Sequence, residues 1–308
     1  MRILVTPRSM TRTTPVDLPE LAPLVERGWE IVPGPAGRLP TEDELCDLVR
    51  DVDGWIAGVE QITARVLDHA PKLRVISRNG VGADAVDVDA TRAHGVEVVL
   101  ARGANSQGVA ELAVAHILNG LRDLTGANAV LHDGGWERRL GREVPDLRIG
   151  VLGFGAIGRI VARTLAAMGA DVIAHDPFVP VEGIPGVRSG SAEDVFVATD
   201  VVSLHIPPAA DGAPVVGATQ IAAMRPGGIL VNTARAALVD QDAVLAALED
   251  GVLAVYAVDA FDREPPELTP LLRHPRTVMT PHLGGYTAAS TRRASALAVH
   301  NLMTSLGG

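Results

Sequence analysis

Three polar side chains in the second half of the chain have the chemistry of a hydride-transfer site. Arg235, Glu264 and His282 each follow an apolar, strand-like segment. A guanidinium binds a carboxylate with two hydrogen bonds. A carboxylate beside an imidazole fixes its tautomer and favours the protonated ring. Reduction of a 2-oxo acid needs such a carboxylate clamp and such a proton donor, so we predict that these three residues are catalytic.

Each of these residues, taken alone, has a simpler explanation. Arg235 could form a surface ion pair, Glu264 could be an ordinary loop residue before a proline, and His282 could be structural. All three, however, follow successive predicted strands, and ligands bind at the carboxyl ends of strands in open α/β sheets. A nucleotide-binding motif also lies upstream of them. We therefore favour the catalytic interpretation.

That upstream motif is a glycine-rich turn between a strand and a helix. Arg148–Leu152 is apolar, Gly153-Phe154-Gly155-Ala156-Ile157-Gly158 follows, and a helical pattern continues to Met168. In a G-x-G-x-x-G turn the first glycine permits the bend, and the second lets the backbone approach a pyrophosphate. The third allows close packing of helix on strand. The helix N-terminus then attracts the phosphates. The context on both sides predicts a dinucleotide site.

Asp176 ends the next apolar strand, in His175-Asp176-Pro177-Phe178. A carboxylate at this position accepts hydrogen bonds from ribose hydroxyls and repels a 2′-phosphate. No arginine follows at once to receive such a phosphate. The sequence therefore favours NAD over NADP as the cofactor, although Asp176 could also be a turn residue before proline.

Composition limits the remaining functions. The 308 residues carry a formal charge of −10, which argues against nucleic-acid binding. Hydrophobic residues make up 47% and aromatic residues 3%, a balance typical of buried parallel strands under small-faced helices. The single cysteine, Cys46, rules out an internal disulfide and a cysteine-based metal cluster, and we expect no metal. Without a signal-peptide pattern or an apolar run of about 18 residues, we expect a soluble, cytoplasmic protein.

Strand and helix signals alternate along the chain in two blocks. The expected strands are 3–6, 29–32, 54–59, 74–78 and 97–100 in the first block, and 148–152, 171–175, 200–205, 228–232, 253–258 and 277–280 in the second. The expected helices are 41–50, with a capping box of Thr41 and Glu44, 105–124, a helix after Gly155, others near Ser191, Thr219 and Asp240, and 287–306. This alternation predicts parallel sheets with right-handed crossovers.

Six motifs in this order carry a family resemblance. They are GFGAIG, HDP, SLHIP, NTAR, VDAFDREPP and TPHLGG, and SRNGVGADAVDV and NSQGVAEL precede them. The chain resembles the D-isomer-specific 2-hydroxyacid dehydrogenases over nearly its whole length. Its greatest similarity is to the short, phosphoglycerate-dehydrogenase-like members.

The resemblance implies an α/β fold of two Rossmann-like doubly wound domains with the active site between them. The substrate (catalytic) domain is discontinuous, residues 1–100 plus 286–308, and residues 101–285 form the NAD-binding domain. The family's catalytic arginine, glutamate and histidine fall on Arg235, Glu264 and His282. The implied substrate-binding residues are Asn79, Gly80, Val81 and Arg235, and the implied cofactor contacts are Gly153, Gly155, Ala156, Ile157, Gly158, Asp176, His205, Thr233 and Asp259. Members commonly form homodimers.

The implied activity is the NAD-dependent interconversion of a small D-2-hydroxy acid and its 2-oxo acid. A further anionic group, such as a phosphate or phosphonate, could meet a basic residue among Arg8, Arg12, Arg78, Arg138 and Arg139. However, the phosphoglycerate dehydrogenases carry a basic residue near the third strand, where this chain reads Ala57-Gly58-Val59-Glu60. Ala236 also replaces the usual glycine after the catalytic arginine, and Ala85 replaces an asparagine. Two alternatives stay open, an NADH-sensing corepressor-like binding protein and a formate or phosphite oxidoreductase.

Overall fold

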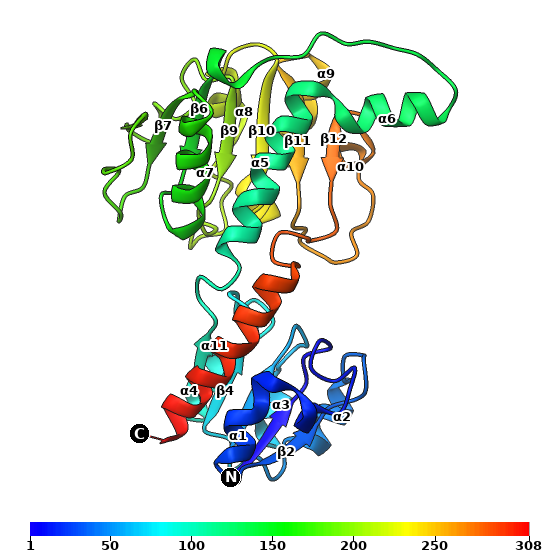
Figure 1. Ribbon diagram of the computed structural model, residues 1–308, viewed down its shortest axis with the longest axis vertical. Coiled ribbons are helices and arrows are strands. Elements are labelled where there is room, and N and C mark those ends of the chain that lie inside the picture. The colour runs from blue at the N-terminus through cyan, green and yellow to red at the C-terminus, as the bar shows by residue number, and fades with distance from the viewer. Residues whose placement is uncertain (308) are drawn as a thin grey trace. The chain divides into compact units, whose positions relative to one another are not determined.

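The computed structural model describes residues 1–307 and divides into two compact α/β units (Figure 1). Unit 1 comprises Met1–Asn105 and the segment from Thr287 onward, and unit 2 is Ser106–Tyr286. Each unit is built around one parallel sheet. The fold class predicted from the strand–helix alternation is confirmed.

Unit 1 contains a five-stranded sheet in the order β2-β1-β3-β4-β5. Its strands are β1 (Arg2–Val5), β2 (Glu30–Pro33), β3 (Gly54–Ala57), β4 (Val75–Arg78) and β5 (Glu97–Leu100). Its α-helices are α1 (Ala22–Glu26), α2 (Glu42–Leu48), α3 (Ala64–Asp68), α4 (Val88–Ala93) and α11 (Ala288–Gly307), and Pro15–Asp17 and Pro19–Leu21 form 3₁₀ turns. Apolar residues of α2 and α3 pack in one core of the sheet, and those of α1 and α11 pack in another.

Unit 2 contains a seven-stranded parallel sheet in the order β12-β11-β10-β9-β6-β7-β8. Its strands are β6 (Arg148–Leu152), β7 (Asp171–His175), β8 (Val187–Ser189), β9 (Val201–Leu204), β10 (Gly228–Asn232), β11 (Leu253–Val258) and β12 (Thr277–Met279). Its α-helices are α5 (Ser106–Arg122), α6 (Leu124–His132), α7 (Ala156–Ala167), α8 (Ala218–Ala222), α9 (Gln241–Glu249) and α10 (Pro270–Arg273), and Val144–Asp146 and Ala236–Leu238 form 3₁₀ turns. Helices α5 and α7 contribute to one core of this sheet, and α8 and α9 to the other.

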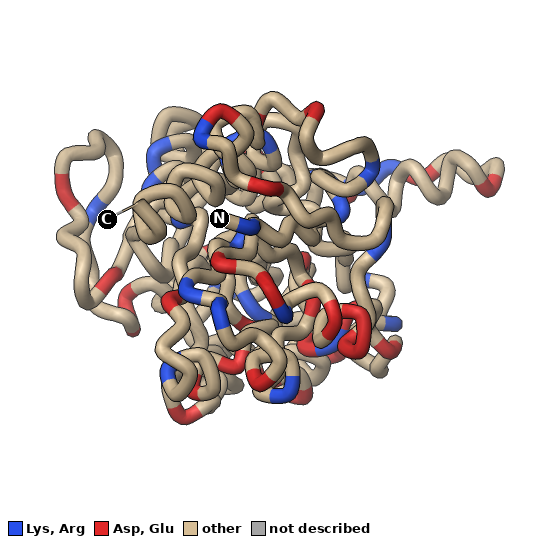
Figure 2. Tube along the Cα trace, turned by 90° about the horizontal axis from the view of Figure 1, so that it is seen from below, with Lys and Arg blue, Asp and Glu red and all other residues tan. Residues whose placement is uncertain are grey.

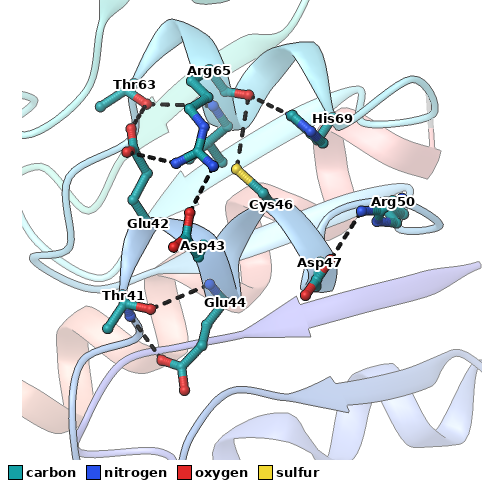
Figure 3. Close-up of polar contacts among 11 residues, drawn as sticks. Thr41, Glu42, Asp43, Glu44, Cys46, Asp47, Arg50, Thr63, Arg65 and His69 are labelled. Atoms are coloured by element: carbon teal, nitrogen blue, oxygen red, sulfur yellow. Dashed lines mark hydrogen bonds and ion pairs between the residues drawn. The ribbon is translucent and has the colours of Figure 1, made fainter.

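Local sequence explains how α2 begins. The Thr41 side chain accepts a hydrogen bond from the Glu44 N–H, and the Glu44 carboxylate accepts one from the Thr41 N–H (Figure 3). This is the capping box predicted from the sequence, and it satisfies two N–H groups that a helix start leaves unpaired. Cys46, on the same helix, is buried with its Sγ 4.0 Å from the Arg65 carbonyl oxygen. The thiol is therefore part of the core packing.

The structure differs from the predicted elements in three places. The helix expected near Ser191 is wrong, because residues 192–197 form turns and Ala198 takes a left-handed φ of 53°. The expected 105–124 helix ends at Arg122, since Asp123 has a φ of 49° and a second, unpredicted helix, α6, follows. The short edge strand β8 was also not predicted. It has little apolar burial to mark it, because two of its three residues are exposed.

Positively and negatively charged residues are mixed along the chain. Figure 2 shows Lys and Arg interspersed with Asp and Glu rather than gathered into one basic stripe in that view. No helix among residues 1–307 has the length and apolar character needed to cross a membrane.

Candidate active site

The predicted proton donor and its carboxylate partner are in contact. The Nδ1 atom of His282 lies 2.7 Å from the Oε1 atom of Glu264, and both side chains are about half exposed. The Phe261 N–H also donates to this Glu264 oxygen. With Nδ1 held by the carboxylate, Nε2 is the ring atom left to exchange a proton with a substrate.

His282 sits on a strained turn. Its φ is 52°, in the left-handed region that non-glycine residues enter at a cost, and such strain clusters at functional sites. Its own N–H donates to the Thr280 carbonyl oxygen at 2.9 Å. The turn therefore needs other interactions to hold it.

Asp259 supplies those interactions. This almost fully buried carboxylate follows β11 and accepts hydrogen bonds from the Thr280 hydroxyl at 2.6 Å, the Leu283 N–H at 2.7 Å and the Gly284 N–H at 2.8 Å. The three donors flank His282 on both sides. The resemblance implied that Asp259 contacts the cofactor, and its hydrogen bonds within the chain hold the histidine turn.

His116 extends this network and was not among the predicted site residues. Its Nε2 lies 3.1 Å from the Thr280 hydroxyl oxygen, and because that hydroxyl donates to Asp259, His116 is the donor here. Burial lowers the pKa of His116, and the charge of Asp259 acts in the opposite direction. In the sequence, His116 could not be distinguished from the apolar residues around it on the long helix. Its partner Thr280 is 164 positions away.

Arg235 follows β10, the strand next to β11 in the sheet. Its carbonyl oxygen accepts a hydrogen bond from the Asn232 side-chain amide at 2.8 Å, and one guanidinium nitrogen donates to the Ala234 carbonyl oxygen at 2.8 Å. Because parallel strands end at the same edge of a sheet, Arg235, Glu264 and His282 all lie beyond the carboxyl ends of three adjacent strands.

The predicted cofactor residues lie along the same edge. They follow β7, β6, β9, β10 and β11, which are successive neighbours in the sheet, and they are Asp176, the Gly153–Gly158 turn, His205, Thr233 and Asp259. Strand order reverses between β6 and β9, and such a switch point is where open α/β sheets bind ligands. The structure therefore places all of these predicted residues at one switch-point edge.

The glycine turn has the close contacts that its sequence implied. Gly153 has a φ of 96°, and a Cβ there would lie 2.4 Å from the His205 carbonyl oxygen. A Cβ on Gly158 would lie 1.9 Å from the Gly153 carbonyl oxygen, so no larger residue fits at either position. By contrast, nothing lies within 4 Å of a Cβ built on Gly155, at the start of α7. The backbone is thus open where a pyrophosphate would approach.

Comparison with known proteins agrees with this arrangement. Residues 114–284 match the family model described as "D-isomer specific 2-hydroxyacid dehydrogenase, NAD binding domain". The chain belongs to the D-isomer-specific 2-hydroxyacid dehydrogenase family. It is 36% identical over 274 residues to a D-3-phosphoglycerate dehydrogenase of Mycobacterium tuberculosis, covering 87% of this chain and 52% of that protein. The chain thus spans about half the length of the phosphoglycerate dehydrogenase it matches.

Two further relatives match over almost their full lengths. A hydroxypyruvate reductase of Thermotoga maritima is 32% identical over 272 residues, which cover 86% of this chain and 89% of that protein. The crystal structure of the TT0316 protein from Thermus thermophilus is 35% identical, with a TM-score of 0.86, and the match covers 100% of this chain and 97% of that one. The first supports the family and the second supports the fold.

The region that matches the NAD-binding domain has buried polar atoms that suit a dinucleotide. Nδ1 of His205 and Oγ1 of Thr233 are buried without a hydrogen-bond partner, and Nε2 of His205 contacts the Ser203 hydroxyl at 2.9 Å. Burial lowers the pKa of His205 to about 4, so its ring is neutral at pH 7. Buried polar groups are rarely left unpaired, so the two atoms mark places where the cofactor's polar groups fit.

Asp176 is arranged to remain ionised and to accept further donors. Burial acts to raise its pKa, but the N–H groups of Phe178, Phe154 and Val179 outweigh that effect and hold the pKa below its ordinary value. A carboxylate has about four lone-pair sites, so the three backbone donors leave capacity for a ribose hydroxyl. The residues therefore fit NAD.

The predicted substrate-binding segment Asn79–Val81 belongs to unit 1, directly after β4. The Asn79 N–H already donates to the Ala57 carbonyl oxygen at 2.8 Å, which removes it from the predicted set of free amides. Among the described residues, the N–H groups of Gly80 and Val81 donate no hydrogen bond. These two amides are the ones available to a substrate carboxylate.

Proposed function

We propose that this chain catalyses the NAD-dependent interconversion of a small D-2-hydroxy acid and its 2-oxo acid. The observation that carries the proposal is the 2.7 Å contact between Glu264 and His282 at the carboxyl edge of the NAD-binding sheet. A histidine with one nitrogen braced by a carboxylate is a proton donor with a fixed direction.

Each catalytic residue has one task. Arg235 and the Gly80 and Val81 amides bind the substrate carboxylate, which orients carbon 2. Bound NADH supplies the hydride that is transferred to that carbon. Protonated His282 donates its Nε2 proton to the carbonyl oxygen, so the 2-oxo acid becomes a 2-hydroxy acid, and Glu264 stabilises the imidazolium before transfer. In the reverse direction neutral His282 accepts the hydroxyl proton.

The test is NADH oxidation with a panel of 2-oxo acids, including glyoxylate, pyruvate and hydroxypyruvate. His282→Ala removes the proton donor, so kcat falls by about 10²-fold or more, while the NADH Kd from fluorescence titration stays within a few-fold. His300→Ala, an exposed histidine on α11, is the matched control and keeps full activity. An equal loss of NADH affinity in His282→Ala would contradict the role we assign.

No observation on the described residues favours the corepressor-like or the formate- or phosphite-oxidising alternative.

We also propose that the chain forms a homodimer. Helix α6 and the segment after it support this proposal. None of the α6 residues is buried, and Figure 1 shows this helix extending away from the sheet of its own unit. Trp136 is 79% exposed and Leu140 is fully exposed, and Leu124 and Leu131 of α6 are exposed as well, so this one segment carries several large apolar side chains that a partner could cover. Trp136→Ser together with Leu140→Ser yields a monomer in sedimentation velocity if this is correct. Location in the cytoplasm stays a prediction.

A further inference from the structure

Two oppositely charged side chains are buried together at the carboxyl edge of the unit 1 sheet. Glu60 lies three residues beyond β3 and is 3% exposed, and Arg78 is the last residue of β4 and is 5% exposed. Strands β3 and β4 are neighbours, with Ala57 paired to Arg78. Buried charges normally have partners for all of their polar atoms.

Glu60 is held in place by one oxygen only. Its Oε1 accepts hydrogen bonds from the Gly58 N–H at 2.8 Å and from the Thr6 hydroxyl, whose oxygen in turn accepts from the Trp55 indole N–H at 2.8 Å. Its Oε2 is buried and has no partner. The carboxylate is therefore fixed, with one strong acceptor unused.

Arg78 has a buried nitrogen without a hydrogen-bond acceptor. Its Nε donates to the Gly82 carbonyl oxygen at 3.3 Å, whereas its buried Nη1 has no partner. Burial lowers the pKa of Arg78, and the charges of Glu60 and Asp84 act against that effect. The Arg78 guanidinium therefore has an N–H donor without an acceptor, and the Glu60 carboxylate has an oxygen without a donor. The charge of Glu60 acts on Arg78, so the two groups are close enough to influence each other.

The position of Arg78 connects this pair with the substrate. Arg78 directly precedes the segment that carries the Gly80 and Val81 amides, and its bond to the Gly82 carbonyl oxygen places the guanidinium beside that loop. If those amides bind the substrate carboxylate, Arg78 is the buried cation that directly precedes the carboxylate-binding segment. Both side chains are almost sealed from solvent, so a bulky substituent would have to displace the packing around them.

We propose that Glu60 and Arg78 recognise a hydroxyl group on carbon 3 of the substrate and exclude a phosphate there. The inference rests on the proposed 2-oxo acid reduction. A hydroxyl donates to Glu60 Oε2 and accepts from Arg78 Nη1, so it satisfies both atoms at once. A methyl group leaves both charges unmatched, and a phosphate brings negative charge against the Glu60 carboxylate. The preferred substrate class is a 3-hydroxy-2-oxo acid without phosphate.

The first test compares three acids on the unmodified protein in an NADH oxidation assay: hydroxypyruvate, pyruvate and 3-phosphohydroxypyruvate. A site that pairs with a hydroxyl discriminates strongly against analogues that lack it, so we expect kcat/KM for hydroxypyruvate to exceed that for pyruvate by about 10²-fold or more. It should exceed that for the phosphorylated acid by at least about tenfold. Pyruvate reduced as well as hydroxypyruvate, or preference for the phosphorylated acid, overturns the inference alone. Oxidation of NADH with none of the acids overturns the proposed function as well.

The second test assigns the selectivity to the pair. Glu60→Gln keeps the shape and removes the negative charge, so the ratio of kcat/KM for the phosphorylated acid to that for hydroxypyruvate rises at least about tenfold. Glu97→Gln, an exposed glutamate on β5 of the same sheet, leaves all ratios within about twofold. Arg78→Lys keeps the charge but loses the fixed fork, which lowers the preference for hydroxypyruvate over pyruvate. A Glu60→Gln protein that loses all three activities in equal proportion would show that the carboxylate is only structural.

Discussion

The network around Asp259 gives the sharpest prediction, because it separates a positioning role from a cofactor-binding role. In Asp259→Asn the side chain keeps its size but can offer only one carbonyl oxygen to three donors. The Thr280 hydroxyl and Leu283 N–H share one carboxylate oxygen, and the Gly284 N–H has the other. In the better amide orientation, the new NH₂ group faces the Gly284 N–H, and one buried hydrogen bond to a charged acceptor is lost.

The magnitude follows from that geometry. Losing a buried charged acceptor and leaving a donor unpaired costs about 2–4 kcal/mol of unfolding free energy. The turn that carries His282 also loses its anchor, and a shift of about 1 Å in a reacting group can reduce the rate about 10²-fold. We expect kcat to fall by that factor while the NADH Kd changes less than about fivefold.

The assays are urea unfolding, steady-state NADH oxidation and fluorescence titration with NADH. Asp240→Asn is the matched control, because Asp240 accepts two backbone N–H groups at the exposed start of α9, where asparagine caps equally well. That variant should retain its stability and kcat. An Asp259→Asn protein with normal kcat and a strongly raised NADH Kd would refute the positioning role and establish Asp259 as a cofactor ligand.

Three further predictions test other parts of unit 2. Asp200→Ala leaves two partly exposed cations, Arg142 and Arg225, without their buried carboxylate, and should lower the unfolding free energy by about 2–3 kcal/mol in urea. Because burial lowers the pKa of His205 to about 4 and the unfolded ring titrates near 6.5, its contribution to stability is present above pH 6.5 and lost as the pH falls towards 4. That loss is about 2 kcal/mol between pH 7.5 and 5.0, and it should be missing from His205→Gln in paired urea titrations. Asp176→Asn should reduce the preference for NADH over NADPH in kcat/KM at least about tenfold, and an unchanged preference would argue against its contact with the ribose.

The strands were predictable because burial and chain direction produce a simple signal. In unit 2 the expected segments 148–152, 171–175, 228–232 and 253–258 coincide with β6, β7, β10 and β11. These strands are buried on both faces, so they appear in the sequence as continuous apolar runs. Helix α6 was not predicted. It buries none of its own residues, so its apolar side chains do not form a face that packs on the core of unit 2.

The edge on which the site lies could also be predicted, but its internal contacts could not. Parallel strands carry their carboxyl ends to one edge, so residues such as Arg235 and His282 share an edge once the strands are assigned. Which carboxylate accepts from which donor depends on turn geometry that leaves no periodic pattern. The bond between His116 and Thr280 and the three bonds of Asp259 belong to this class. The engaged amide of Asn79 does too, because it depends on how β4 continues beside Ala57.

Buried polar side-chain atoms without a hydrogen-bond partner occur at strand ends in both units, and one physical argument explains them. Within residues 1–307, five buried side-chain polar atoms lack a hydrogen bond, and four of them lie at or just beyond the carboxyl ends of strands: those of Glu60, Arg78, His205 and Thr233. Each such atom costs free energy, so a fold retains it only where something else compensates. In His205 and Thr233 the unused atoms lie on the edge that carries the dinucleotide turn. In Glu60 and Arg78 they lie at the ends of two neighbouring strands of unit 1, and the strand of Arg78 leads into the segment that carries the unengaged amides. If the proposed function holds, cofactor and substrate recognition would use the same device, polar groups that the parallel sheet presents at its edge and leaves for a ligand to complete.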